Sequence, residues 1–369
     1  MAIEKVNIEK FLQLAEKHPV IDVRSPGEYL HAQIPNAFSV PLFTDEERKI
    51  VGTAYKQQSR EAAIKIGLDF FGVKMKQVVE DVESILGDFR GTVINEIKSK
   101  TEKIILIHCW RGGMRSTAIA WLLDMYGFKV YTLGGGYKAF RNWVLKQFDK
   151  EYNLKILGGY TGSGKTLILH ELCRMGNTVI DLEKLANHKG SAFGAIGENP
   201  QPSQEMFENL LATKLKEVLS TKDEVANNEN IVSNIWIEDE SQRIGRLIIP
   251  NSFWEKMRTS PVYFVDIPFE ERLNYLVDTY GSFEKTSLSE SIERIQKRLG
   301  GLETKNATKF LAENNIRECF RILLNYYDKL YTKGLHNRDN LSSLLNKIDC
   351  ENVNAKQNIQ KILYPKAIA

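Results

Sequence analysis

The sequence is poor in cysteine and in long apolar segments. Its 369 residues contain four cysteines, Cys109, Cys173, Cys319 and Cys350, without a C-x-x-C pair. This spacing predicts neither a disulfide framework nor a zinc site, so we expect reduced thiols. No apolar run reaches the ~18 residues of a membrane span, and residues 1–5 (MAIEK) lack the basic and apolar character of a signal peptide. We therefore expect a cytoplasmic protein.

The sequence also lacks a strong excess of charge of either sign. The formal net charge is +3, and 43% of the residues are hydrophobic, which is ordinary for a globular protein large enough for two domains. A nucleic-acid-binding face would therefore have to come from local clusters of basic residues.

Strands and helices alternate along the first part of the chain. Apolar segments predict strands at residues 19–24, 104–109 and 129–133, and helices at 115–125 and 137–148. Alternation of this kind predicts a parallel sheet.

The alternation restarts after a polar joint at residues 149–151. Strands are predicted at 154–157, 178–181, 231–237 and 262–266, a P-loop helix at 166–173 and a polar loop at 221–230. From residue 268 onward the pattern is mainly helical.

The segment 108–116 (HCWRGGMRS) places a cysteine between a predicted strand and a predicted helix. Backbone N–H groups and the helix N-terminus would surround Cys109, and Arg111 and Arg115 add positive charge. These groups favour a thiolate, or a persulfide or selenide anion carried on it, and Arg115 could bind an oxyanion through two hydrogen bonds. We predict that Cys109, Arg111 and Arg115 are catalytic.

Two kinds of protein share this cysteine loop. Cys-x5-Arg-Ser after a histidine is the signature of Cys-dependent phosphatases. The upstream segment 22–29 (DVRSPGEY), with His31 and residues 34–37 (IPNA), resembles instead the N-terminal motif of rhodanese domains, whose cysteine carries sulfur. The loop is one residue longer than in common single-domain rhodaneses, which suits a larger atom or group than sulfur.

The segment 159–166 (GYTGSGKT) is a complete P-loop between a predicted strand and a predicted helix. The residues expected to bind a diphosphate are Gly159, Thr161, Gly162, Ser163, Gly164, Lys165 and Thr166. Thr166 stands where Mg²⁺ is bound in such loops, and Asp181 and Asp266 are candidate further partners of the ion. ATP, GTP and a prenyl diphosphate present the same diphosphate, so the loop leaves its ligand open.

Two more segments carry charged or polar residues suited to a site, 188–194 (HKGSAFG) and 236–245 (WIEDESQRIG). Candidate contacts to the phosphates of a polynucleotide are Lys138, Arg141, Lys189, Arg243 and Arg246. A solvated charged surface explains both features equally well.

Together the motifs resemble those of the tRNA 2-selenouridine synthases, in which a rhodanese domain is fused to a P-loop domain. Besides the two loops, the resemblance rests on segments 21–24 (IDVR), 51–58 (VGTAYKQQ), 135–139 (GGYKA), 188–194 (HKGSAFG) and 238–241 (EDES). It extends from Val20 to about Arg246, and the helical region beyond is diverged.

This resemblance implies an α/β fold with two parallel-sheet domains. A rhodanese-like domain would occupy residues 1–150, a P-loop NTPase-like domain 151–285, and a mainly helical C-terminal extension 286–369.

The resemblance also implies a transferase that acts on 2-thiouridine at the wobble position of the tRNAs for lysine, glutamate and glutamine. Such enzymes replace sulfur by selenium from selenophosphate, through an S-geranyl intermediate made from geranyl diphosphate. Cys109 would be the selenium-carrying nucleophile, and the P-loop would bind geranyl diphosphate. No tightly bound cofactor or protein-held metal is implied, and Mg²⁺ is compatible with Thr166.

Further residues are expected around the substrate or the tRNA. They are Asp22, Arg24, Lys56, Lys138, His188, Ser191, Phe193, Glu238, Asp239 and Arg243. For the prenyl tail, Phe193, Trp236 and Ile237 are candidate contacts, although such residues are more typical of a core.

Two other classes of protein stay open at this point. One is a Cys-dependent phosphatase fused to a small-molecule kinase, which would need a general-acid loop that is not evident. The other is a non-enzymatic sensor that binds nucleotide, which the retained cysteine and arginines disfavour.

Overall fold

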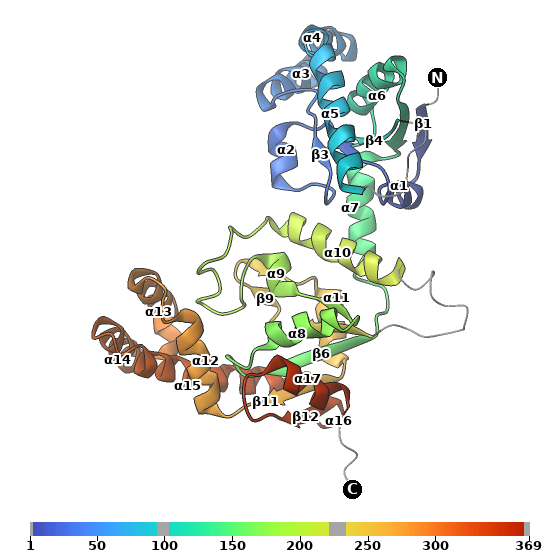
Figure 1. Cartoon of the computed structure of the whole chain (residues 1–369). Helices are drawn as coiled ribbons and strands as arrows, with labels where there is room; N and C mark the ends of the chain where they lie inside the picture. The colour runs from blue at the N-terminus through green and yellow to red at the C-terminus, as the bar shows by residue number, and fades with distance from the viewer. Residues whose placement is uncertain (1–2, 94–102, 221–233, 365–369) are drawn as a thin grey trace. The chain divides into compact units, whose positions relative to one another are not determined.

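The computed structural model describes residues 3–93, 103–220 and 234–364. The chain divides into two compact units, Met1–Lys146 and Gln147–Ala369, each built on a parallel five-stranded sheet (Figure 1). The predicted fold class, with two parallel-sheet domains and a mainly helical C-terminal region, is confirmed. The predicted loop at 221–230 and the first residues of the strand predicted at 231–237 lie outside the described residues.

The sheet of the first unit has the strand order β1-β5-β4-β2-β3. Its strands are β1 (Ile3–Val6), β2 (Val20–Asp22), β3 (Phe38–Ser39), β4 (Ile104–His108) and β5 (Lys129–Leu133). Because β4 is central and all pairings are parallel, the carboxyl ends of β2, β4 and β5 lie at one edge of the sheet. The cysteine loop follows β4 at this edge.

Seven helices accompany this sheet in the described part of the unit. They are α1 (Ile8–Leu14), α2 (Pro26–His31), α3 (Asp45–Gln57), α4 (Arg60–Gly72), α5 (Met75–Val93), α6 (Met114–Tyr126) and α7 (Gly136–Gln147). Helices α5 and α6 bury their apolar faces against β4, where Val82, Ile119 and Ile107 are fully buried in one core. The sequence pattern did not reveal α3, α4 and α5.

The sheet of the second unit has the strand order β12-β11-β6-β8-β7. Its strands are β6 (Leu154–Gly159), β7 (Thr178–Ile180), β8 (Ile235–Glu238), β11 (Val262–Asp266) and β12 (Leu345–Asp349). A short antiparallel hairpin, β9 (Arg243–Ile244) with β10 (Leu247–Ile248), follows β8. Strand β12 belongs to the region expected to be helical, and it pairs along all of β11.

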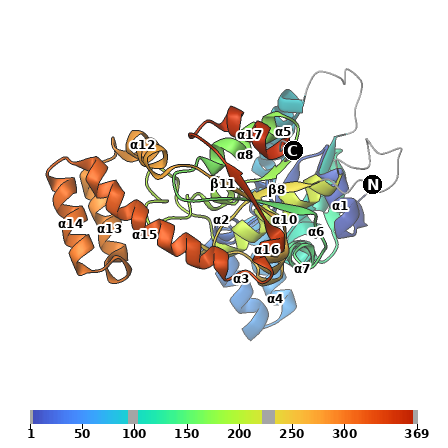
Figure 2. The same ribbon diagram turned by 90° about the horizontal axis from the view of Figure 1, so that it is seen from below.

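The helices of the second unit fall into two groups. The first lies beside the sheet: α8 (Lys165–Arg174), α9 (Leu182–Ala186), α10 (Gln204–Ser220), α11 (Asn251–Thr259), α16 (Leu341–Leu344) and α17 (Ala355–Leu363). The second comprises α12 (Phe269–Tyr280), α13 (Lys285–Leu299), α14 (Gly301–Ala312) and α15 (Ile316–His336). These four helices share an apolar core of their own, and α13, α14 and α15 lie side by side in Figure 2.

None of the helices in the described part of the chain combines the length and apolar character of a membrane-spanning helix.

Candidate functional site

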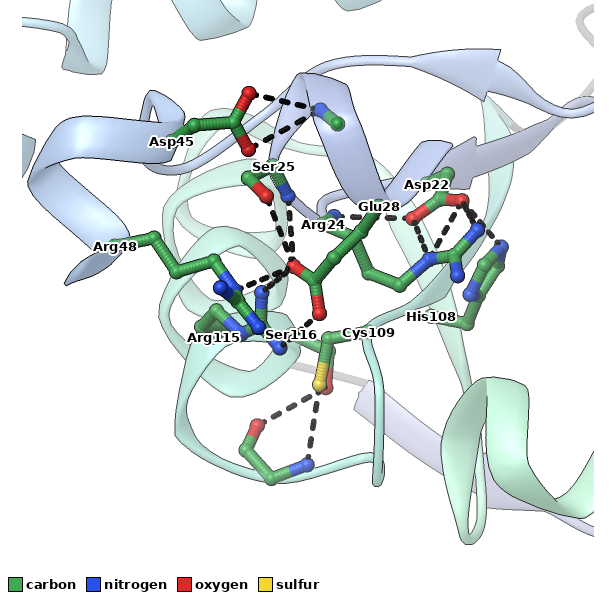
Figure 3. Close-up of polar contacts among 12 residues, drawn as sticks. Asp22, Arg24, Ser25, Glu28, Asp45, Arg48, His108, Cys109, Arg115 and Ser116 are labelled. Atoms are coloured by element: carbon green, nitrogen blue, oxygen red, sulfur yellow. Dashed lines mark hydrogen bonds and ion pairs between the residues drawn. The ribbon is translucent and has the colours of Figure 1, made fainter. Parts of the chain in front are cut away.

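Cys109 lies in a buried turn between β4 and α6. Its Sγ accepts a hydrogen bond from the Gly113 N–H at 3.4 Å and lies 3.3 Å from Ser116 Oγ (Figure 3). Ser116 is on the first turn of α6, where N–H groups of the helix point toward the sulfur. The sulfur therefore lies among N–H and hydroxyl groups of the kind that stabilise an anion.

A second glycine turn, between β5 and α7, holds the cysteine loop in place. Gly136 has a φ of +59°, and a Cβ there would lie 2.3 Å from the Cys109 carbonyl oxygen. That carbonyl accepts a hydrogen bond from Tyr137 N at 2.8 Å, and the Trp110 carbonyl accepts one from Lys138 N at 3.0 Å. The GGYKA segment of the sequence is thus the support of the cysteine loop.

Opposing effects act on the Cys109 thiol. Burial by itself raises its pKa, but the hydrogen bond with Ser116, the N–H of Gly113 and the charge of Arg115 together outweigh burial. The pKa is lowered from its usual value, so Cys109 forms the thiolate more readily than an ordinary cysteine does. This direction agrees with the reactivity expected of Cys109.

Arg115 is directed toward a carboxylate. Its Nη1 donates to Glu28 Oε2 at 2.6 Å and its Nη2 to Oε1 at 3.4 Å (Figure 3). Burial raises the pKa of Glu28, but Arg115, Ser25 and Arg48 outweigh it and lower the pKa to about 2. The expectation that Arg115 offers its guanidinium to an oxyanion therefore does not fit this structure, whereas Arg111 is exposed beside the cysteine.

Asp22 and Arg24 support the site from within the core. Arg24 Nη2 donates to Asp22 Oδ2 at 2.6 Å and to the Ala32 carbonyl at 2.7 Å, and its guanidinium lies 3.8 Å from the centre of the Tyr137 ring. Asp22 and Arg24 are 0% and 1% exposed. Their predicted contact with the substrate or the tRNA is therefore wrong, because no part of either side chain reaches the surface.

The P-loop connects β6 to α8 as predicted. Gly159, Gly162 and Gly164 have positive φ values of 153°, 81° and 70°, which let the loop turn tightly. Lys165 Nζ donates to the Gly159 carbonyl at 2.9 Å, and Thr166 Oγ1 donates to Glu183 Oε2 at 3.0 Å. Ser163 is buried within the loop, and Thr161 forms part of it.

Acidic side chains gather next to the P-loop lysine. Burial raises the pKa of Glu238 and of Glu240 well above the usual value, and repulsion from Glu183 adds to it in both cases. The pKa of Glu183 is also raised by burial, with Lys165 opposing the shift. These carboxyl groups therefore hold protons at a higher pH than ordinary glutamates do.

Of the candidate metal partners, Asp181 lies near this group of carboxyls, because its charge helps to raise the pKa of Glu238 and of Glu183. Asp181 caps α9 and lies 3.3 Å from His170, and Asp266 forms an ion pair with Lys347 at 2.7 Å. Among the described residues, no three His, Cys, Asp or Glu side chains are arranged to hold a metal ion.

Residues in α12, in α15 and directly after α15 hold the P-loop, and sequence reasoning missed them. Tyr331 accepts a hydrogen bond from Gly159 N at 3.1 Å and donates to Asp239 Oδ2 at 2.6 Å, while Arg338 forms an ion pair with Asp239 at 2.6 Å. Arg272 in α12 donates to the Thr161 carbonyl at 3.0 Å. Tyr331 is 172 residues from Gly159, so no local motif could have revealed the contact.

The other residues expected to contact the substrate or the tRNA are divided by their exposure. Lys56, Lys138 and Arg243 are exposed on their units, and Ser191 is half-buried. The remaining side chains are buried: His188, Phe193, Glu238 and Asp239. Their burial does not fit contact with a tRNA surface, and their expected place around a small substrate stays a prediction.

The candidate contacts to a prenyl tail also belong to cores. Trp236 and Ile237 lie in β8, and their side chains are 1% and 0% exposed. Phe193 packs with the helices α12 to α15. The structure therefore offers no open slot lined by Trp236 and Ile237.

The fold and the two loops define a class of protein in which a rhodanese-like cysteine site is joined to a P-loop domain. Family models agree with both parts: residues 7–142 match the rhodanese-like domain, and residues 152–358 match the tRNA 2-selenouridine synthase AAA domain. The chain belongs to the tRNA 2-selenouridine synthase family.

Curated relatives match over most of their length. A tRNA 2-selenouridine synthase of Sulfurovum sp. (strain NBC37-1) is 33% identical, with 85% of this chain and 87% of the relative aligned. A tRNA 2-selenouridine synthase of Nitrosomonas europaea is 32% identical, with 82% of this chain and 73% of the relative aligned. A solved structure, the N-terminal domain of an ATP/GTP binding protein from Clostridium difficile 630, is 39% identical over 38% of this chain and 99% of that chain, with a TM-score of 0.34.

Proposed function

We propose that the protein is a transferase that replaces the sulfur of 2-thiouridine in tRNA by selenium. Membership of the tRNA 2-selenouridine synthase family supports the reaction class. The observation that carries the proposal is the presence, in one such chain, of a cysteine in an anion cradle and a complete P-loop. The substrates would be the tRNAs for lysine, glutamate and glutamine, at the wobble position.

The reaction would proceed in two transfers. In the first, the thiocarbonyl sulfur attacks C1 of geranyl diphosphate, the C–O bond breaks, and diphosphate leaves with the electron pair. In the second, the selenium of selenophosphate attacks C2 of the base, the C–S bond breaks, and geranyl thiolate leaves with the electron pair and takes up a proton. Water then cleaves the Se–P bond, which leaves 2-selenouridine and phosphate. S-alkylation supports the second transfer because a thiol departs from C2 far more readily than the sulfur of an unmodified thiocarbonyl.

The two units would divide this work. The P-loop would hold the diphosphate of the geranyl donor through its backbone N–H groups, and Lys165 would turn from the Gly159 carbonyl to the departing charge. Cys109 would serve the selenium transfer, with its Sγ held by Gly113 and Ser116. No nucleotide hydrolysis is required.

A Cys-dependent phosphatase is less well supported than a selenium transferase. In such phosphatases the arginine of Cys-x5-Arg must bind the oxygens of the phosphoryl group. Here the Nη1 of Arg115 binds Glu28 at 2.6 Å. Hydrolysis of an aryl phosphate that disappears in Cys109→Ser would restore the phosphatase hypothesis.

The test is mass spectrometry of the nucleosides of a 2-thiouridine anticodon stem-loop. The RNA is incubated with the protein and geranyl diphosphate, and then with selenophosphate. We expect the mass of one geranyl group to be gained and then replaced by selenium. No change with either reagent would contradict the proposal.

Two variants test the division of work. Cys109→Ser should abolish selenium insertion and leave geranylation within about twofold of wild type, because the P-loop is unchanged. Lys165→Ala should slow geranylation by about 100-fold, as expected when a charge that stabilises a departing diphosphate is lost. Equal loss of geranylation in Cys109→Ser, or unchanged geranylation in Lys165→Ala, would show that the roles are assigned wrongly.

A further inference from the structure

Trp110 is the residue directly after Cys109, and its side chain reaches the surface where that of the cysteine does not. Trp110 is 38% exposed, whereas Cys109 is 3% exposed. Tryptophan is large and often only partly buried, so this exposure alone indicates no ligand. The packing of the ring and the charges beside it distinguish Trp110 from an ordinary surface residue.

The Trp110 ring is supported from the core. Its centre lies 5.7 Å from the centre of the buried Tyr137 ring, which stacks in turn on His108 at 6.2 Å. The guanidinium of Arg24 lies 3.8 Å from the centre of the same Tyr137 ring. The Trp110 carbonyl also accepts a hydrogen bond from Lys138 N at 3.0 Å. The indole is therefore held in place from one side, and part of its surface is open to a ligand.

Positive charge lies next to the exposed part of the loop. Arg111 follows Trp110 in the chain, Lys138 is bonded to it through the backbone, and both side chains are exposed. Arg115, a third cation of this region, is directed to Glu28 instead (Figure 3). An exposed aromatic ring beside exposed cations is the arrangement with which proteins bind single-stranded nucleic acid, because the ring stacks on a base while the cations bind phosphates.

Stacking on one face of the base suits the second transfer. A nucleophile reaches the trigonal C2 of a pyrimidine from above or below the ring plane, so one face must stay open while the base is held. A base that lies on Trp110 presents its other face and lies beside the loop of Cys109. An enzyme that reacts with a base must also take it out of its own stack, and an aromatic side chain replaces the stacking that is lost.

We propose that Trp110 is the platform on which the reacting base of the RNA stacks, with Arg111 and Lys138 binding neighbouring phosphates. This inference rests on the proposed function in that the base is 2-thiouridine at the wobble position. Trp110 thereby orients C2 for attack, and the two cations keep the RNA strand over the ring.

The test is the affinity of the full-length chain for an anticodon stem-loop, measured by fluorescence anisotropy at one salt concentration. Two RNAs are compared, one with 2-thiouridine at the wobble position and one with an abasic site there. Trp110→Ala should weaken binding of the first RNA by about tenfold, as is typical when one base–aromatic stack is lost, and should leave binding of the abasic RNA within about twofold of wild type. Removal of the base should cost the wild type about the same factor, because both changes break one contact.

Further variants separate stacking from other effects of the substitution. Trp110→Phe keeps an aromatic face and should restore most of the affinity, whereas Trp110→Leu keeps apolar volume alone and should not. Trp121 is 48% exposed on α6, and Trp121→Ala, the matched control, should change binding of neither RNA. Arg111→Ala should weaken binding of both RNAs by the same factor and reduce the salt dependence of binding, as expected for a contact to phosphate.

Three results would overturn the inference. One is a folded Trp110→Ala variant that binds the 2-thiouridine stem-loop as tightly as wild type does. The second needs no variant: a wild-type protein that binds the two RNAs equally. The third is a loss of affinity in Trp110→Ala that appears only with an S-geranylated stem-loop and that Trp110→Leu restores, which would assign the ring to the prenyl group. Base-dependent binding of a stem-loop that is never converted to 2-selenouridine would instead contradict the proposed function and would leave the stacking result as it stands.

Discussion

Ser116 is the side chain in closest contact with the Cys109 sulfur, at 3.3 Å. The single proton of its hydroxyl has two acceptors within reach, the sulfur and the Gly113 carbonyl at 3.0 Å, so Ser116 connects the sulfur to the first turn of α6. Burial alone would raise the pKa of the thiol, and the Ser116 contact is the largest of the effects that lower it. Thiolate formation at Cys109 therefore depends on a neutral side chain more than on the charge of Arg115.

We predict that Ser116→Ala raises the pKa of Cys109, because a donor to the thiolate is lost while burial remains. The pH dependence of Cys109 alkylation should show a pKa below the usual value in wild type and a higher one in the variant, with slower alkylation at neutral pH. Thr117→Ala is the control, because Thr117 Oγ1 donates to the same Gly113 carbonyl at 3.2 Å. Equal shifts of the Cys109 pKa in both variants would show that the Ser116 hydroxyl acts only through its hydrogen bond to the backbone.

At this scale the sequence indicated which residues carry the chemistry but not their partners. Cys109, Lys165 and the glycines could be predicted because each belongs to a contiguous motif. Glu28 lies within the recognised DVRSPGEY segment, yet its partner Arg115 is 87 residues away. Asp22 and Arg24 were misassigned because a charged pair in a motif looks the same whether it faces solvent or the core.

Among the elements, the turn between β5 and α7 determines the shape of the cysteine loop. Gly136 has positive φ, and the space for its Cβ is filled by the Cys109 carbonyl and by Gly112 N. The two turns therefore form one structure, although their segments are separated in sequence by α6 and β5.

We predict that Gly136→Ala disrupts the cysteine loop, whereas Gly127→Ala does not. Both glycines have positive φ, which costs alanine about 1–2 kcal/mol, but only Gly136 also has backbone atoms within 3 Å of the added carbon. The free energy of unfolding in urea should fall further in Gly136→Ala, and Cys109 should lose its enhanced rate of alkylation. Equal effects of the two substitutions would mean that the contact is relieved by a small backbone shift.

The elements could be predicted where burial gives a clear pattern. Strands β5 and β11 occupy the residues that their apolar runs predict, because both are interior strands and bury most of their side chains. Strand β12 (LNKID) was missed because it is an edge strand with few apolar residues. Helix α3 was missed although it contains the VGTAYKQQ segment, because Ala54 is its only buried residue and its sequence shows no apolar stripe.

For the whole molecule, the two units have separate cores. The first unit buries Ile107 and Val82 in one cluster, and the second buries Leu157 and Trp236 in another. Each unit also carries one of the two loops. A ligand of one loop is therefore expected to stabilise the unit that contains it.

We predict two unfolding transitions in scanning calorimetry of the full chain. Diphosphate should raise the midpoint temperature of one of them. At about 100 times its Kd, a ligand of the folded state adds about 2.7 kcal/mol of stability. The transition of the P-loop unit should rise in temperature, and Lys165→Ala should weaken the increase. A single transition, or equal shifts of both, would show that the units unfold together.

The support of the P-loop by Tyr331 and β12 has a consequence for synthesis of the chain. When the P-loop leaves the ribosome, Tyr331 has still to be translated, 172 residues after Gly159. Until β12 emerges, β11 is an unpaired edge of the nascent sheet, open to pairing with other chains. The rhodanese-like unit can fold during translation, whereas the sheet of the P-loop unit is completed only when β12 has been synthesised. A stalled ribosome would therefore release a chain in which the P-loop unit is incompletely folded.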